Sequence, residues 1–177
     1  MELKENLERY TRYANGDISC KCNLEVQDEI INDLDFSAYD LNNSYFGGVT
    51  FNNCDFSSVY LSGSNFGGSI FNKCVFRDNR LVKADWDDTV FADTRFTGLI
   101  AFRTTFLYGN YSNTTFKSCK FTRAVFDCSN FENIIFENCM IDESSFDDCI
   151  FKNVTFLGCN FHGTSLENIE GVIVQSY

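Results

Sequence analysis

The sequence predicts a solenoid, a single domain in which the chain winds into stacked coils. A large apolar residue recurs at every fifth position from Phe36 to Leu166, over 27 positions without an insertion, and 19 of these hold Phe. The residue two before is Ala, Cys, Ser, Thr, Val or Gly in 22 of the 27 cases. Similar residues also recur twenty apart, and positions 36, 56, 76, 96, 116, 136 and 156 are all Phe. Together these periods indicate coils of four five-residue repeats.

The five-residue period fits neither an amphipathic helix, which repeats at about 3.6 residues, nor an isolated strand, which repeats at 2. It places two side chains inward in each repeat, in a large slot such as Phe56 and a small slot such as Cys54. The other three positions are mostly polar and face water. One repeat alone buries nothing, so successive coils must stack on each other to form a core.

Several repeats carry a recognisable motif. The best examples are "CDFSS" (54–58), "SNFGG" (64–68), "ADWDD" (84–88) and "SNFEN" (129–133). In these motifs the chain resembles the pentapeptide repeat proteins, over about 130 of its 177 residues. The resemblance implies an all-β fold, a right-handed quadrilateral β-helix. Nearly seven coils, stacked at the strand spacing of about 4.8 Å, would form a rod about 30 Å long.

The repeat region is expected to cover residues 34–168, between two short ends. Residues 1–33 form an N-terminal cap, with a helix over 1–15 and a strand over 18–26, where "ISCKCNLEV" alternates strictly. These two elements would cover the first coil, whose open end exposes core and unpaired backbone. The C-terminal tail, 169–177, either caps the last coil or pairs with another chain in a homodimer.

The nine cysteines are explained by the repeat. Six of them occupy small slots, where a thiol behaves as a small buried hydrophobe: Cys54, Cys74, Cys119, Cys139, Cys149 and Cys159. The C-x-C pair of Cys20 and Cys22 has no obvious third ligand, because His162, the single histidine, lies far along the chain. No metal site and no cofactor are therefore expected.

Charge excludes several classes of partner. The formal net charge is −11, which disfavours direct binding to nucleic acid or to anionic membranes. The N-terminal "MELKENLERY" lacks the apolar core of a signal peptide, and no stretch is long enough to span a membrane. We expect a soluble cytoplasmic protein.

The charges are unevenly distributed along the chain. Residues 70–123 form a basic band with 9 basic and 5 acidic residues. Residues 1–69 have 4 basic and 11 acidic residues, and residues 124–177 have 1 basic and 9 acidic residues.

The repeat breaks its own pattern at "LIAFRTTFLY" (99–108), where Leu99 fills a small slot and Ala101 a large one. An exchange of volumes would keep the core filled. It would also leave apolar side chains pointing outward, next to the basic band. The predicted partner-binding residues are Ile100, Phe102, Arg103, Leu107, Tyr108, Arg80, Lys83, Lys120 and Arg123. The alternative interpretation is a local bulge that tucks the apolar groups in.

An enzyme is the least favoured functional class. A stacked β-helix has a solid core without a ready pocket, and the chain has no Gly-rich phosphate loop and a single histidine. A rigid macromolecule-binding rod is expected instead. The resemblance to members that protect bacterial DNA gyrase and topoisomerase IV from quinolones implies a DNA-mimicking modulator of those enzymes. The alternative is a partner-specific regulator, adaptor or immunity protein that binds through the apolar and basic residues near 99–108.

Overall fold

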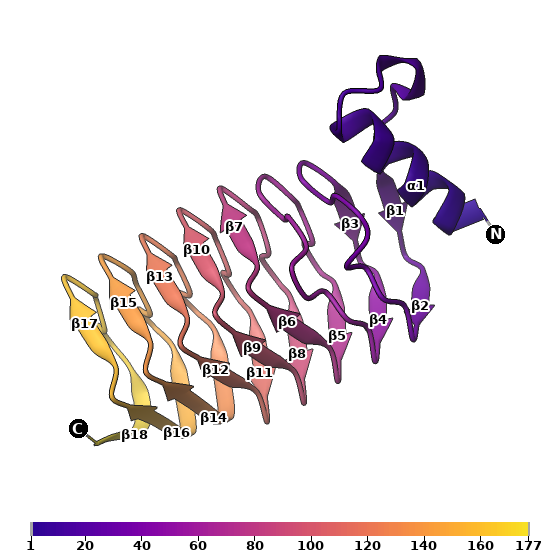
Figure 1. The fold of residues 1–177 in the computed structure, drawn as a ribbon. Coiled ribbons are helices and arrows are strands. Elements are labelled where there is room, and N and C mark those ends of the chain that lie inside the picture. The colour runs from indigo at the N-terminus through magenta and orange to yellow at the C-terminus, as the bar shows by residue number, and fades with distance from the viewer. Residues whose placement is uncertain (1, 177) are drawn as a thin grey trace.

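The computed structural model describes residues 2–176 and forms a four-walled β-helix of about seven coils. The coils stack in chain order from the N-terminal helix to the C-terminal end (Figure 1). The predicted fold class, a right-handed quadrilateral β-helix, is confirmed. Every strand pairing is parallel and joins residues twenty apart, apart from a register shift in the last coil. This offset confirms four five-residue repeats per coil.

Each wall of the helix is a stack of short strands. One wall, called here the β10 wall, consists of β7 (Arg80–Val82), β10 (Ile100–Phe102), β13 (Lys120–Thr122), β15 (Met140–Asp142) and β17 (Asn160–His162). The opposite wall, called the β11 wall, begins with β2 (Ile30–Asn32), β4 (Thr50–Asn52), β5 (Ile70–Asn72), β8 (Val90–Ala92) and β11 (Asn110–Ser112).

The two remaining walls complete each coil. The third wall contains β6 (Val75–Arg77), β9 (Arg95–Thr97) and β12 (Thr115–Lys117). Three longer strands round the corner between the β11 wall and this third wall: β14 (Asn130–Glu137), β16 (Ile150–Leu157) and β18 (Glu170–Ser176). The fourth wall starts with β1 (Glu25–Gln27) and β3 (Tyr45–Gly47) and continues as single bridges such as Asp85↔Thr105.

The N-terminal cap differs in part from the prediction. Helix α1 (Glu2–Ala14) is present and buries Leu7 and Tyr10 against the first coil. The strand expected over 18–26 is wrong for most of its length, because a 3-10 turn, η1 (Ile18–Cys20), follows the helix and leaves Ile18 85% exposed. The Asp17 side chain accepts a hydrogen bond from the Ser19 amide at 3.1 Å, a local contact that competes with a strand.

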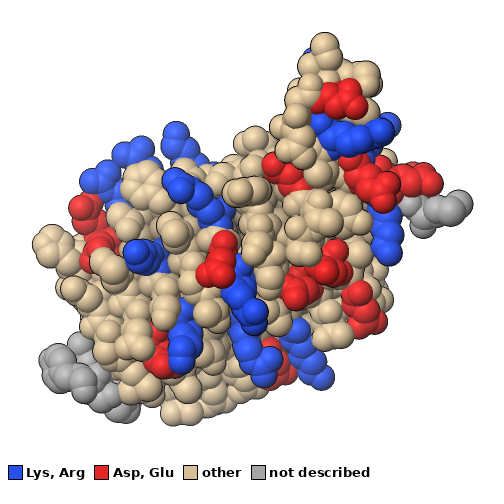
Figure 2. All heavy atoms as spheres, in the orientation of Figure 1, with Lys and Arg blue, Asp and Glu red and all other residues tan. Residues whose placement is uncertain are grey.

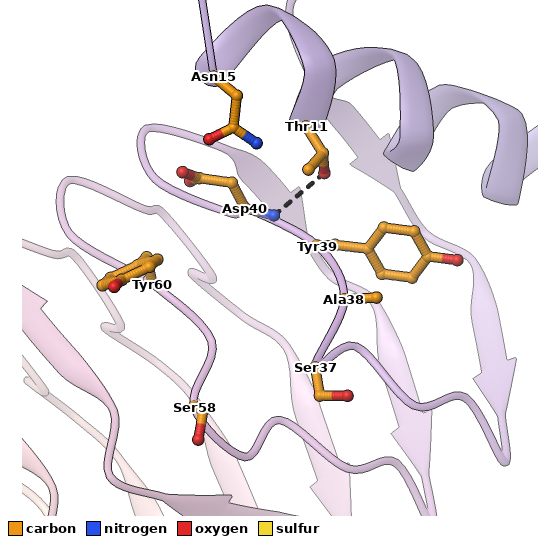
Figure 3. A pocket seen from close by; sticks show the side chains of 8 residues that line it. All are labelled: Thr11, Asn15, Ser37, Ala38, Tyr39, Asp40, Ser58 and Tyr60. Carbon is orange, nitrogen blue, oxygen red and sulfur yellow. Dashed lines mark hydrogen bonds between the residues drawn. The ribbon is translucent and has the colours of Figure 1, made fainter.

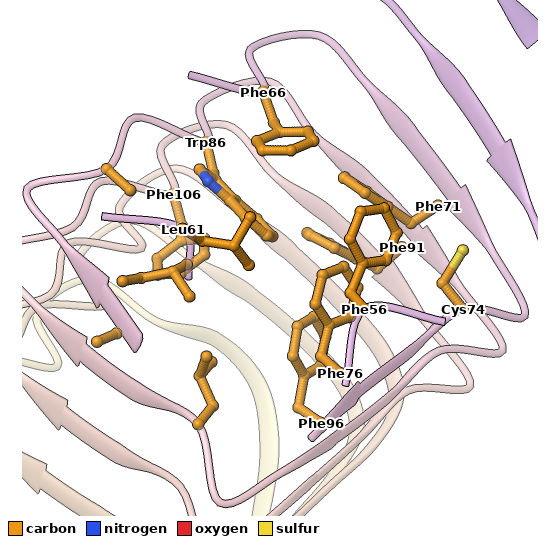
Figure 4. Close-up of a cluster of buried hydrophobic side chains, with 14 of the residues drawn as sticks. Phe56, Leu61, Phe66, Phe71, Cys74, Phe76, Trp86, Phe91, Phe96 and Phe106 are labelled. Carbon is orange, nitrogen blue, oxygen red and sulfur yellow. The ribbon is translucent and has the colours of Figure 1, made fainter. Parts of the chain in front are cut away.

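The core is a set of stacked large slots. All slots from Phe36 to Phe156 are buried. In the column that runs from Phe36 through Phe76 to Phe156, successive rings lie nearly parallel. Phe76 stacks on Phe56 with ring centroids 4.7 Å apart and on Phe96 at 4.8 Å (Figure 4). The last two slots were also expected to be buried, but Phe161 is half-buried and Leu166 is 38% exposed. The described residues after Leu166 do not complete another coil over these two slots.

The small slots supply hydrogen-bond donors as well as small volumes. Cys74 Sγ donates to the Phe51 carbonyl at 3.5 Å, and Thr94 Oγ1 donates to the Phe71 carbonyl at 3.1 Å. Thiols and hydroxyls in these slots thereby satisfy carbonyls of the preceding coil. All nine cysteines are free, and the six in small slots are buried except Cys159, which is half-buried. Burial also raises the pKa of the Cys149 thiol to about 12.

The register extends beyond both expected ends of the repeat region. Val26 and Ile31 are buried in line with the later slots, so part of the expected cap belongs to the first coil. At the other end β18 pairs with β16, with Gly171 opposite Phe151. A Cβ on Gly171 would lie 1.7 Å from the Phe151 carbonyl oxygen, so only glycine fits there.

Candidate protein-binding surface

The segment around Ala101 keeps the regular backbone. β10 pairs with β7 and β13 without a register shift, and Leu99 and Ala101 are each 1% exposed. The two inward residues have therefore exchanged volumes within an intact coil. The bulge interpretation is wrong, and Ile100 points outward with 42% of its surface exposed.

Phe102 and Arg103 form a pair at the edge of β10. The Arg103 guanidinium carbon lies 5.2 Å from the centroid of the Phe102 ring, which is within the range of a cation–π interaction. Phe102 is half-buried, and Arg103 is exposed at a corner with φ +53°. The ring is thus outside the core, as predicted, and it lies against the rod surface beneath a cation.

Leu107 and Tyr108 belong to the adjoining fourth wall. The Leu107 amide donates to Asp87 Oδ1 at 2.9 Å, and its side chain is half-buried. Tyr108 is 55% exposed and adopts a φ of +58°, a left-handed conformation that disfavours side chains other than Gly, Asn and Asp. The apolar residues of the predicted site therefore lie on two adjoining walls, close together along the chain.

The predicted basic residues surround this segment. Arg80 and Lys120 are the strand neighbours of Ile100 on either side, and Lys83 and Arg103 occupy successive corners. Figure 2 shows Lys and Arg side chains gathered over the middle coils. Within residues 2–176 these four cations make no salt bridge. Arg123 differs, since its Nε lies 2.6 Å from Glu143 Oε2, and this prior pairing leaves it less available to a partner.

Two exposed residues that extend this surface were missed by the sequence analysis. Tyr60, 61% exposed, pairs with Arg80, and Met140, 43% exposed, pairs with Lys120. Both lie on the same line as Ile100 along the rod. The twenty-residue spacing of 60, 80, 100, 120 and 140 is the signal in the sequence that places them on one line.

The acidic side chains of the fourth wall serve the fold. Asp127 Oδ1 accepts the Asp147 amide at 2.9 Å, and Asp147 Oδ1 accepts the Glu167 amide at 2.8 Å. The Ser165 hydroxyl, 2.6 Å from Asp147, is the main cause of a lowered pKa at that carboxyl, whereas burial raises the pKa of Asp87. These carboxylates link successive coils, so part of the acidic surface has a structural role.

The hollows in the described part of the chain lie beside the N-terminal cap. One, of about 150 Å³, opens between α1 and the first coils and is lined by residues that include Thr11, Asp40 and Tyr60 (Figure 3). The Asp40 amide donates to Thr11 Oγ1 at 3.1 Å across it. Residues 2–176 contain no cluster of three or more His, Cys, Asp and Glu side chains that could hold a metal ion. None of their helices is long and apolar enough to cross a membrane.

This architecture defines a parallel β-solenoid repeat protein, with a solid core and an exposed apolar and basic surface on two adjoining walls. The profile of the family described as pentapeptide repeats matches residues 40–78 and 129–168, in 8 copies. The two matched segments, which together cover less than half of the chain, are similar to pentapeptide repeats. The comparison with curated proteins found no match to this chain.

One solved structure with a TM-score of 0.50 supports this fold, and further structures match with lower scores. A trypsin-treated variant of QnrB1, a plasmid-mediated fluoroquinolone resistance protein, matches with a TM-score of 0.50 and 17% identity, covering 82% of this chain and 73% of that one. A pentapeptide repeat protein from the thylakoid lumen of Arabidopsis thaliana has a TM-score of 0.42 and 14% identity, covering 80% and 70%. One from the cyanobacterium Cyanothece 51142 has 0.40 and 16%, covering 75% and 91%.

Proposed function

We propose that this chain is a non-catalytic, cytoplasmic rod that binds another protein through the surface formed by β7, β10, β13 and the neighbouring corner at Tyr108. This set is called the patch below. The observation that supports it is the exposure of Ile100 and Tyr108 next to four cations without an acidic partner among the described residues. Apolar groups left in water add nothing to folding, so an interface is the use that best accounts for them.

The chemistry of the patch suits a protein partner. Aromatic and arginine anchors contribute a large share of the energy in many protein interfaces, and Phe102 with Arg103 supplies one such pair. Arg80, Lys83 and Lys120 would steer an acidic partner toward it and make association depend on salt. A non-catalytic role is supported by the core, which stacked side chains fill along the rod.

The test is capture of partners from a lysate with the intact chain as bait. Ile100→Ser should reduce recovery of a specific partner, measured by quantitative mass spectrometry. Ile150→Ser is the matched control, because Ile150 is 47% exposed at the equivalent strand position on the β11 wall. Equal recovery with both variants would show that the patch is not the binding surface.

Salt dependence gives a second readout. Arg103→Glu should slow association with the captured partner, and the difference should shrink as ionic strength rises. Lys73→Glu is the control, since Lys73 occupies an equivalent corner, with φ +55°, on the edge of the β11 wall. A loss of association rate that is the same for both variants would indicate a general charge effect and no steering by the patch.

A second candidate function is modulation of DNA gyrase or topoisomerase IV by DNA mimicry. It is supported by the net charge of −11 and by the fold likeness to QnrB1. A DNA mimic should carry its negative charge along the rod, whereas here a basic band separates the acidic ends. The test is a supercoiling assay with purified gyrase and a quinolone. Restored supercoiling on addition of the chain would support this function, and no effect would contradict it.

A further inference from the structure

Five outward residues form a line along the rod on the β10 wall, and apolar and basic side chains alternate in it. In order they are Tyr60, Arg80, Ile100, Lys120 and Met140, called the stripe below. Parallel pairing joins each one to the next, so the line is continuous. The three apolar members are 61%, 42% and 43% exposed. The two basic members are exposed and form no salt bridge within residues 2–176.

The spacing of the stripe is fixed by the coils. Ring centroids in the core column of the adjoining third wall repeat at 4.7 to 4.8 Å, the ordinary distance between paired strands. Side chains of the same kind, apolar or basic, therefore recur in the stripe about every 9.6 Å, and the whole stripe spans about 19 Å. A partner that satisfies all five positions needs acidic and apolar groups that alternate with nearly this period.

An α-helix has such a period. Residues seven apart lie on one helix face and are about 10.5 Å apart, and residues three or four apart lie midway between them. A helix with apolar residues at every seventh position and carboxylates midway would match the stripe over about 21 Å, against about 19 Å on the rod. The mismatch of about 2 Å over the full length is within the reach of flexible Arg, Lys and Met side chains.

We propose that the stripe is a docking site for an amphipathic α-helix of a partner protein, lying parallel to the rod axis, with acidic and apolar residues alternating every three to four positions. The inference rests on the proposed function and specifies which kind of structural element of the partner protein binds the patch. A helix about 10 Å wide would also cover the neighbouring row of the same wall. That row contains Phe102, and Arg103 at the adjacent corner, whose guanidinium lies over the ring, would form the rim of the interface.

Other occupants fit the stripe less well. In an extended strand, side chains on one face recur at about 6.8 Å, which falls out of step with a 9.6 Å period. A partner strand also has no free edge to pair with at the middle of the stripe, because β10 is already hydrogen-bonded to β7 and β13. A nucleic acid duplex would place phosphates over Ile100 as well as over the cations, and the chain as a whole would repel it.

The experiment uses two synthetic helical peptides of about 21 residues and identical composition. The first carries leucine at every seventh position of one face and glutamate midway, and the second gathers the same residues into two blocks on that face. Binding to the full chain is measured by fluorescence anisotropy. The alternating peptide should bind at least about tenfold more tightly than the block peptide. Ile100→Ser or Arg80→Glu should remove most of this difference, and Ile150→Ser should not.

Several results would overturn the inference. These are equal binding of the two peptides, no binding of the alternating peptide, or tighter binding of a 20-base-pair DNA duplex or of phosphatidylserine vesicles. If the peptides fail while partner capture still depends on Ile100, the helix assignment is wrong and the proposed protein-binding function stands. If partner capture is itself insensitive to Ile100→Ser, the proposed function fails independently of the peptide result.

Discussion

The β11 wall and the β10 wall share one repeat but use their outward positions differently. On the β11 wall, Asn52 Nδ2 donates to Asn32 Oδ1 at 2.8 Å, and Asn72 Nδ2 donates to Asn52 Oδ1 at 2.8 Å. Outward asparagine side chains there bond to the asparagine at the same position of the next coil. In the middle of the β10 wall, the positions around Ile100 hold apolar and basic groups that make no such bonds.

This difference separates two uses that the outward positions of one repeat can have. The inward slots fix the fold, so the outward positions can either add stability through ladders between coils or remain available for other molecules. Amide ladders satisfy their own donors and acceptors, which leaves few groups for a partner. Exposed Ile100 and the unpaired Lys120 have the opposite property. The distinction between a stabilising wall and a binding wall can be tested by substitutions at equivalent positions.

The largest expected effect concerns the core that both walls share. Phe96 stacks between Phe76 and Phe116, with centroids at 4.8 and 4.7 Å. Phe96→Ala should lower the free energy of unfolding by about 3–5 kcal/mol, because a cavity remains in a packed core. Urea denaturation followed by circular dichroism measures it. A loss below about 1 kcal/mol would contradict the stacked-core description and would remove the common frame on which the comparison depends.

A smaller effect is expected where the β10 wall departs from the repeat. Ala101→Leu alone should cost about 1–3 kcal/mol through overpacking, and Leu99→Ala alone about 2–5 kcal/mol through a cavity. The double variant restores the usual order of small and large residues and should be less destabilised than the sum. A double-mutant cycle measures this coupling. Strict additivity would mean that the two volumes do not compensate each other.

Amide ladders are expected to contribute about 1 kcal/mol per residue, and this prediction compares the walls directly. Asn52→Ala removes two hydrogen bonds and should lower the free energy of unfolding by about 1 kcal/mol. Thr122→Ala is the control, since Thr122 occupies the equivalent strand position on the β10 wall and should cost only a few tenths of a kcal/mol. Similar losses for both variants would erase the proposed difference between the walls.

The sequence predicted those parts of the molecule that repeat with one fixed period. The core positions from Phe36 to Phe156 follow from the spacing of Phe alone, because each slot has the same environment. The ends were predicted less well. Val26 and Ile31 occupy slots without the Phe or Leu that marks them elsewhere, and the alternation from Ile18 was overridden by a local turn after α1. The periodic pattern of large apolar residues is therefore weaker at the ends of the repeat region than in its middle.

The candidate surface was predicted in outline. The exchange of Leu99 and Ala101 marked its centre, because a break in a strict repeat is visible in the sequence. Individual side-chain contacts are harder to predict from the sequence. The Arg123–Glu143 ion pair, for example, depends on side-chain rotamers at two exposed corners. Tyr60 and Met140 were missed because neither is charged and neither breaks the repeat. Their common line with Ile100 becomes apparent when outward residues are aligned by coil.

The smallest expected effect on stability is also the sharpest test of the binding wall. Phe102 lies outside the core, half-buried under Arg103, in a strand with an unbroken register. Phe102→Ala should therefore change the free energy of unfolding by less than about 1 kcal/mol. The same substitution should weaken partner binding by about 1–3 kcal/mol if the ring is an interface anchor. Both quantities are measured on one variant, by urea denaturation and by titration with the captured partner. A loss of several kcal/mol in stability would make Phe102 a core residue and the β10 wall an ordinary part of the scaffold. Unchanged stability with unchanged binding would leave the fold as described and place the interface on another wall.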